Sequence, residues 1–182
     1  MPVYIALLRG INVGPHKRMK MEKLRASCAA LGMKNVASYI QSGNVVFKSV
    51  ELSSSAVSKK LGAQIMRDFG FSADVIVRTK DEMSRIIEGS RLAKQPGSDP
   101  AKLHAAFLAK SPATEALQRL ESLTKLPDKI QFAEKEIYFY FPNGVSGSSL
   151  WKHSMDKVLA VSATMRNWKT VTALYEMAAQ CE

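Results

Sequence analysis

The same order of predicted strands and helices occurs twice along this chain of 182 residues. In each half an apolar strand leads into an amphipathic helix, and two strands joined by a turn follow. A second helix and a fourth strand complete the set. This β-α-β-β-α-β order defines the split βαβ, or ferredoxin-like, unit, and a further helix trails each copy. We therefore predict an α+β fold of two ferredoxin-like βαββαβ halves, each with a trailing helix, packed together.

A short polar segment separates the two copies. Residues 94–101 contain two prolines, a glycine and a serine, a composition typical of a linker. The N-terminal half then covers residues 1–93 and the C-terminal half residues 102–182. Right-handed crossovers place both helices of a half on one face of its sheet. The halves can cover each other's open faces or join edge to edge, and the sequence does not choose between these arrangements.

Hydrophobic spacing and capping residues assign the individual elements. In the first half we predict strands at 3–8, 35–40, 45–48 and 73–78, and helices at about 19–31, from Ser53 to Phe69, and from Thr79 to about Gly89. In the second half we predict strands at 103–108, 130–133, 137–141 and 161–163, and helices from Ser111, at 150–159 and at about 167–178.

The charge of the chain favours anionic partners. The formal net charge is +10, and one cluster near the start contributes much of it. Such a cluster attracts nucleic acid, phosphate or carboxylate, but a solvated basic helix that keeps the protein soluble has the same composition. The cluster consists of Arg9, Lys17, Arg18, Lys20, Lys23 and Arg25, with Glu22 as its acidic member.

The compartment follows from what the sequence lacks. It shows no signal peptide and no stretch of about 18 apolar residues, the length that a membrane helix requires. Its two cysteines, Cys28 and Cys181, are too few for a disulfide framework. We expect a soluble cytoplasmic protein without a membrane partner, and its oligomeric state stays open.

The first strand ends in the segment that most suggests a site. Arg9 follows the strand directly, and a loop with Gly10, Asn12 and Gly14 leads to Lys17 and the basic helix. Such an order presents backbone N–H groups and fixed positive charge to an anion. In a βαββαβ unit the first loop and the central turn emerge at one end, so we expect residues 10–18 near Ser42, Gly43 and Asn44. Asparagine and serine at such positions are also ordinary turn residues.

Three segments resemble a known family. They are Leu8-Arg9-Gly10-Ile11-Asn12-Val13-Gly14, Tyr39-Ile40-Gln41-Ser42-Gly43-Asn44-Val45-Val46-Phe47 and Ala163-Thr164-Met165-Arg166-Asn167-Trp168-Lys169-Thr170-Val171. The chain is similar over essentially its whole length to domain-of-unknown-function family 1697. The resemblance implies a two-part α+β fold of ferredoxin-like character and no established activity. Family members usually carry a second glycine after Gly14, where this chain has Pro15, which removes one N–H donor.

Standard chemical motifs are absent from the sequence. Gly10 and Gly14 fit neither the P-loop nor the dinucleotide-binding spacing, and both can serve turns of positive φ. Arg166 and Asn167 precede the last predicted helix, where Asn167 suits an N-cap and Arg166 can pair with an acid. The three histidines lack metal-ligand spacing, so we expect no metal and no cofactor.

Three classes of function stay open. The leading hypothesis is a binding module for a small anionic ligand, with a site formed by Arg9, Gly10, Asn12, Gly14, Lys17, Ser42, Asn44, Arg166 and Asn167. Nucleic-acid binding is the alternative, since RNA-recognition motifs share the topology, but their aromatic sheet pattern is absent here. An enzyme that uses His16 or Arg9 on a small substrate is neither supported nor excluded.

Overall fold

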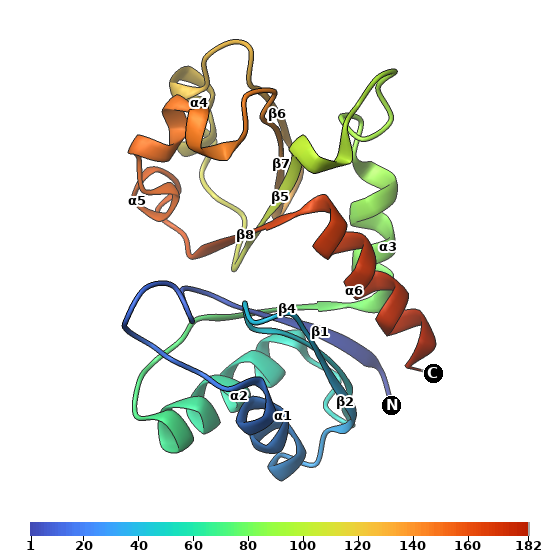
Figure 1. Ribbon diagram of the computed structural model, residues 1–182. Helices are drawn as coiled ribbons and strands as arrows, with labels where there is room; N and C mark the ends of the chain where they lie inside the picture. The colour runs from blue at the N-terminus through green and yellow to red at the C-terminus, as the bar shows by residue number, and fades with distance from the viewer. Residues whose placement is uncertain (182) are drawn as a thin grey trace. The chain divides into compact units, whose positions relative to one another are not determined.

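Two four-stranded antiparallel sheets form the framework of the protein (Figure 1). The structure, a computed structural model, describes residues 1–181 except for the side chain of Trp151. The strand order is β2-β3-β1-β4 in the first sheet and β6-β7-β5-β8 in the second. Both follow the order β-α-β-β-α-β along the chain, so the prediction of an α+β fold with two similar halves is confirmed.

The first half contains β1 (Val3–Leu8), α1 (Met21–Ala30), β2 (Lys34–Tyr39), β3 (Asn44–Lys48), α2 (Ser54–Phe69), β4 (Val75–Thr79) and α3 (Lys80–Gly89). The second half contains η1 (Pro100–Lys102), β5 (Leu103–Leu108), α4 (Thr114–Leu123), β6 (Lys129–Phe132), β7 (Glu136–Tyr140), η2 (Val145–Gly147), η3 (Ser149–Lys152), α5 (Met155–Leu159), β8 (Ala163–Asn167) and α6 (Trp168–Gln180), where η marks a 3₁₀ helix.

The main core of the first half lies between its sheet and the helices α1 and α2, which run along one face of the sheet (Figure 1). Alternate residues of β1 point into this core, because successive side chains of a strand face opposite sides. Tyr4, Ala6 and Leu8 meet Leu24 of α1 and Leu61 of α2 there, and all five are at most 1% exposed. The second half repeats this arrangement with α4 and α5.

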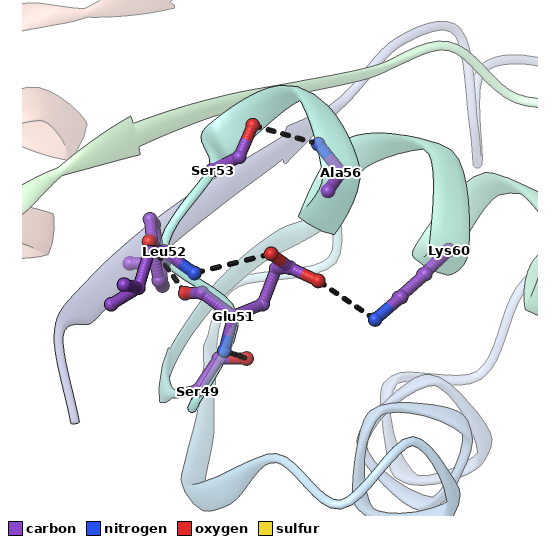
Figure 2. A network of polar contacts seen from close by, with 7 residues as sticks. Ser49, Glu51, Leu52, Ser53, Ala56 and Lys60 are labelled. Atoms are coloured by element: carbon purple, nitrogen blue, oxygen red, sulfur yellow. Dashed lines mark hydrogen bonds and ion pairs between the residues drawn. The ribbon is translucent and has the colours of Figure 1, made fainter.

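A polar network fixes the connection from β3 to α2 (Figure 2). The Glu51 carboxylate accepts hydrogen bonds from Lys60 Nζ at 2.7 Å and from the Leu52 N–H at 3.2 Å. The hydrogen bond from Lys60 lowers the pKa of Glu51. Ser53 caps α2 by accepting a bond from the Ala56 N–H at 3.3 Å, as the sequence predicted. These contacts order the end of the first sheet where β3 finishes.

The chain divides into two compact units that differ from the predicted halves. One unit contains residues 1–85 and the residues from Thr172 onward, and the other contains residues 86–171. The expected linker at 94–101 lies in the second unit and is bonded to its sheet. Gln95 Oε1 accepts from Lys129 Nζ at 3.0 Å, and the Asp99 N–H donates to the Tyr140 hydroxyl at 3.3 Å.

The end of α6 belongs to the first unit. Tyr175 contacts Ser84 of α3 at 3.4 Å between their hydroxyl oxygens, and Cys181 Sγ lies 3.7 Å from the Asn35 carbonyl of β2. Met177 and Cys181 line a cavity of about 320 Å³ together with residues of β2 and β3. The end of α6 therefore packs against the face of the first sheet that α1 and α2 leave open.

Two predicted elements of the second half were wrong. The helix expected at 150–159 is a short 3₁₀ turn, η3, and a separate helix, α5, because His153 and Ser154 have extended backbone angles. The strand expected at 161–163 is β8, which extends to Asn167. The residues after 163 are part of this strand: Thr164 is only 7% exposed, and its hydroxyl accepts a hydrogen bond from Arg166 at 2.7 Å.

Candidate anion site

Three loops meet where β1 ends. They are the β1–α1 loop (residues 9–20), the β2–β3 turn (residues 40–43) and the α2–β4 loop (residues 70–74). The Leu8 N–H donates to the Gly43 carbonyl at 2.8 Å, and the Arg9 N–H donates to the Asp74 carbonyl at 2.9 Å. The predicted meeting of residues 10–18 with the central turn is confirmed by Asn12, whose Nδ2 donates to the Gln41 carbonyl, and by Ile11, which lies against Gly43. The α2–β4 loop is an unpredicted third member.

Asn12 holds the β1–α1 loop against the turn. Its Nδ2 donates to the Gln41 carbonyl at 2.7 Å and to the Met19 carbonyl at 2.8 Å. Its Oδ1 accepts from the Met19 N–H at 2.8 Å. Both amide hydrogens and one oxygen lone pair are therefore used inside the fold. The backbone of Asn12 is left-handed at φ 55°, a conformation that asparagine tolerates better than most residues.

Asn44 stabilises the turn from inside. It is fully buried, and its Nδ2 donates to the Tyr39 carbonyl at 3.1 Å and to Ser42 Oγ at 3.0 Å. The sequence suggested Ser42 and Asn44 as groups that orient a ligand. Their contacts instead connect the two ends of the turn, so any contribution of Asn44 to binding is made through the shape of this loop.

Gly43 is a residue that the sequence analysis did not include among the site residues. Its φ is 73°, and a Cβ atom there would lie 2.7 Å from both Ile11 Cδ1 and Leu8 Cβ. Gly10 and Gly14 also have positive φ, but a Cβ at either would meet no atom within 4 Å. Gly43 thus permits close packing of the turn against the first loop, and its place in a Ser-Gly-Asn turn was the available signal.

Most of the basic cluster is used within the fold. Arg9 forms an ion pair with Asp74 at 3.5 Å, which supplies a carboxylate acceptor expected for it. Lys17 Nζ donates to the Ser72 carbonyl at 2.9 Å. Lys23 Nζ donates to the Asp68 carbonyl and lies 4.7 Å from the centre of the Phe69 ring, and Arg25 donates to Ser38 Oγ at 2.7 Å.

Two cations of the cluster point to solvent. Arg18 and Lys20 are exposed, and no hydrogen bond or ion pair of their side chains is found among the described residues. Lys20 is the N-cap residue of α1, and no side chain accepts a cap hydrogen bond at this helix start. The partial positive charge of a helix N-terminus therefore adds to the two cations, although Glu22 in the first turn offsets part of it.

Arg166 and Asn167 belong to the second unit. Asn167 Oδ1 accepts a hydrogen bond from the Thr170 N–H at 2.8 Å, which confirms the predicted N-cap. Arg166 donates to Thr164 Oγ1 at 2.7 Å and to the Met165 carbonyl at 3.0 Å, and burial lowers its pKa to about 10. In the first unit Arg78 of β4 corresponds to Arg166: it pairs with Ile5 of β1 as Arg166 pairs with Ala105 of β5. The next residue, Thr79, caps α3.

Two kinds of structure are absent from the part of the chain that is described. No group of three or more His, Cys, Asp or Glu side chains in residues 1–181 is arranged to hold a metal ion. The helices of this same range are too short or too polar for any of them to cross a bilayer.

The sheets and loops define the chain as a two-part α+β protein with a cationic loop cluster at the end of its first sheet. The chain belongs to the family DUF1697, described as a protein of unknown function, whose profile matches residues 1–138. A solved structure, that of conserved bacterial protein SP0830 from Streptococcus pneumoniae, is similar with a TM-score of 0.80 and 23% identity, over 97% of this chain and 98% of that chain. This similarity shows a shared fold. No curated protein matches the chain, so no activity is assigned by comparison.

Proposed function

We propose that the protein is a binding module for a small anionic ligand, held where the β1–α1 loop and the β2–β3 turn meet. The observation that carries this proposal is the Asn12 carboxamide, which bonds Gln41 of the β2–β3 turn and Met19 near the end of its own loop. It holds a cationic loop in one shape before a ligand arrives, and such preorganisation reduces the entropy lost on binding.

In this proposal the site residues have two kinds of role. Arg9, Lys17, Arg18 and Lys20 supply positive charge, and Gly10 and Gly14 let backbone N–H groups approach the anion. Asn12, Ser42 and Asn44 keep the loops in place through the hydrogen bonds described above. Arg166 and Asn167 are assigned to the start of α6, which their contacts within the second unit support.

The location and the alternatives follow from the same proposal. The strand order of each sheet supports the interpretation of each half as a ferredoxin-like unit. We also propose that the protein is located in the cytoplasm. Nucleic-acid binding is less well supported, because the aromatic sheet pattern of RNA-recognition motifs is absent and the end of α6 packs against the open face of the first sheet. Binding through the remaining charge alone would decrease steeply with salt. An enzymatic reaction has no observation in its favour.

A thermal-shift and calorimetric screen tests the proposal. Inorganic phosphate, nucleotides, phosphosugars and carboxylates are added to the wild type and to a double variant, Arg18→Ala with Lys20→Ala. The control is Lys59→Ala with Arg119→Ala, which removes two exposed charges elsewhere. We expect at least one anion to raise the Tm of the wild type and the control, and to do so far less for the double variant. Equal losses in both variants, or no response to any anion, would show that the proposal is wrong.

A further inference from the structure

Two exposed apolar side chains lie on the loops of the candidate site. Val13 is 75% exposed and Ile40 is 50% exposed. The hydrogen bond from Asn12 to the Gln41 carbonyl joins the two loops. Val13 is the residue after Asn12, and Ile40 is the residue before Gln41. The two side chains are therefore carried by neighbouring loops at the same end of the first sheet.

The backbone of Ile40 is unusual for its residue type. Its φ is 49°, in the left-handed region, where a β-branched side chain is an outlier. Glycine or asparagine would form the same turn with less strain. Because half of the Ile40 side chain stays in solvent, burial within the fold recovers only part of this strain. Strained residues of this kind concentrate at ligand contacts.

Cationic groups lie next to this apolar pair. The Asn12 N–H donates to the Lys17 carbonyl at 3.1 Å, so the chain folds back and brings Lys17 beside the Asn12–Val13 segment. Lys17 and its neighbour Arg18 are both exposed. The same loop thus carries both positive charge and exposed apolar surface.

We propose that the anion bound here is carried on an apolar body, as in an alkyl or aryl phosphate or carboxylate. Lys17 and Arg18 meet the anionic group, and Val13 and Ile40 cover the apolar part. This inference rests on the proposed function for the position of the anionic group. The strain at Ile40 is then compensated by contact with the ligand.

Paired probes separate the two parts of the ligand. Titration calorimetry compares inorganic phosphate with phenyl phosphate, and acetate with benzoate. We expect the aryl member of a pair to bind about tenfold more tightly, as covering an apolar group of this size predicts. The substitution Val13→Ser should remove most of this preference. The matched control is Val50→Ser, because Val50 is 76% exposed and follows β3 at the other end of the sheet.

Ile40→Asn provides a second, independent measurement. Asparagine tolerates the left-handed backbone, so we expect a Tm equal to or above that of the wild type, together with loss of the aryl preference. A purely structural role for Ile40 would give a lower Tm and unchanged binding. Equal binding of both members of each pair, or a preference that survives Val13→Ser and Ile40→Asn, overturns this inference and leaves the proposed function standing. Failure of every probe to bind overturns both.

Discussion

At the scale of single residues, the loop cluster depends on backbone conformations that few residues accept. Asn12, Lys17 and Ile40 have positive φ without being glycine, and Gly43 combines positive φ with close packing. The Asn12 carboxamide then holds the loop in this shape. The shape of the candidate site therefore depends on a few positions. Replacing each of them should change the free energy of unfolding for a different physical reason.

The two glycines Gly43 and Gly14 differ in a testable way. Both have positive φ, but only at Gly43 would a Cβ lie 2.7 Å from neighbouring carbon atoms. We expect Gly14→Ala to lower the free energy of unfolding by about 1 kcal/mol through backbone strain alone. Gly43→Ala adds overpacking and should cost about 3 kcal/mol. Urea denaturation of both variants measures the difference, and equal losses would contradict the role given to Gly43.

The sequence predicted where the loops meet better than it predicted the contacts of their side chains. The meeting of residues 10–18 with the central turn followed from topology alone. The use of Asn12 and Asn44 inside the fold did not, because a sequence does not reveal which polar side chains bond to the backbone. The partner of Lys17 is the Ser72 carbonyl in the α2–β4 loop, and that of Lys23 is the Asp68 carbonyl at the end of α2. No local pattern connects either pair.

At the scale of elements, α3 and α6 begin in the same way. Each follows a strand that ends with an arginine and a polar residue, Arg78-Thr79 or Arg166-Asn167. Thr79 and Glu82 form a reciprocal capping box, with the Thr79 N–H donating to Glu82 Oε2 at 2.7 Å and the Glu82 N–H donating to Thr79 Oγ1 at 3.1 Å. Threonine followed by glutamate three residues later is the sequence pattern of such a box.

Removal of either cap should destabilise the protein. We expect Thr79→Ala and Asn167→Ala each to lower the free energy of unfolding by about 1 kcal/mol, because the start of the helix loses the side-chain acceptor for one of its N–H groups. The variants Thr79→Ser and Asn167→Ser keep an acceptor oxygen and should lose much less. Urea denaturation of the four variants gives the comparison. Alanine variants as stable as the serine variants would show that the caps contribute little.

Helices were predicted best where their apolar spacing is long and regular. The helix expected at about 19–31 is α1 at 21–30, and Val57, Leu61 and Ile65 of α2 are all buried as their spacing indicated. The failures at 150–159 and 161–163 lie where short elements follow one another. There the extended residues His153 and Ser154 interrupt an apolar pattern that would suit a single helix.

At the scale of the whole molecule, one half-buried histidine links stability to pH. His104 packs against Phe141 with ring centres 5.5 Å apart, and burial lowers the pKa of His104 below its ordinary value of about 6.5. The folded protein therefore disfavours the charged imidazole. The stabilisation is complete above pH 6.5 and is lost as the pH falls through the lowered pKa, because the unfolded chain binds the proton more tightly.

Replacement of this histidine should flatten the acid side of the stability curve. We expect the free energy of unfolding of His104→Phe to decrease less between pH 7.5 and pH 5 than that of the wild type. Phenylalanine keeps the ring contact with Phe141 and has no proton to bind. Chemical denaturation at several pH values tests this, and parallel curves for the two proteins would contradict the assignment to His104.

The division into compact units also has a consequence for synthesis of the chain. The first unit is discontinuous, since the segment from Thr172 onward joins residues 1–85 only after residues 86–171. A ribosome that adds about 5 to 20 residues per second delivers that segment on the order of ten seconds after residue 85. During this interval the open face of the first sheet lacks its helix, while the second unit has already been synthesised as one uninterrupted stretch. The part of the molecule that is synthesised first is therefore the part that is completed last.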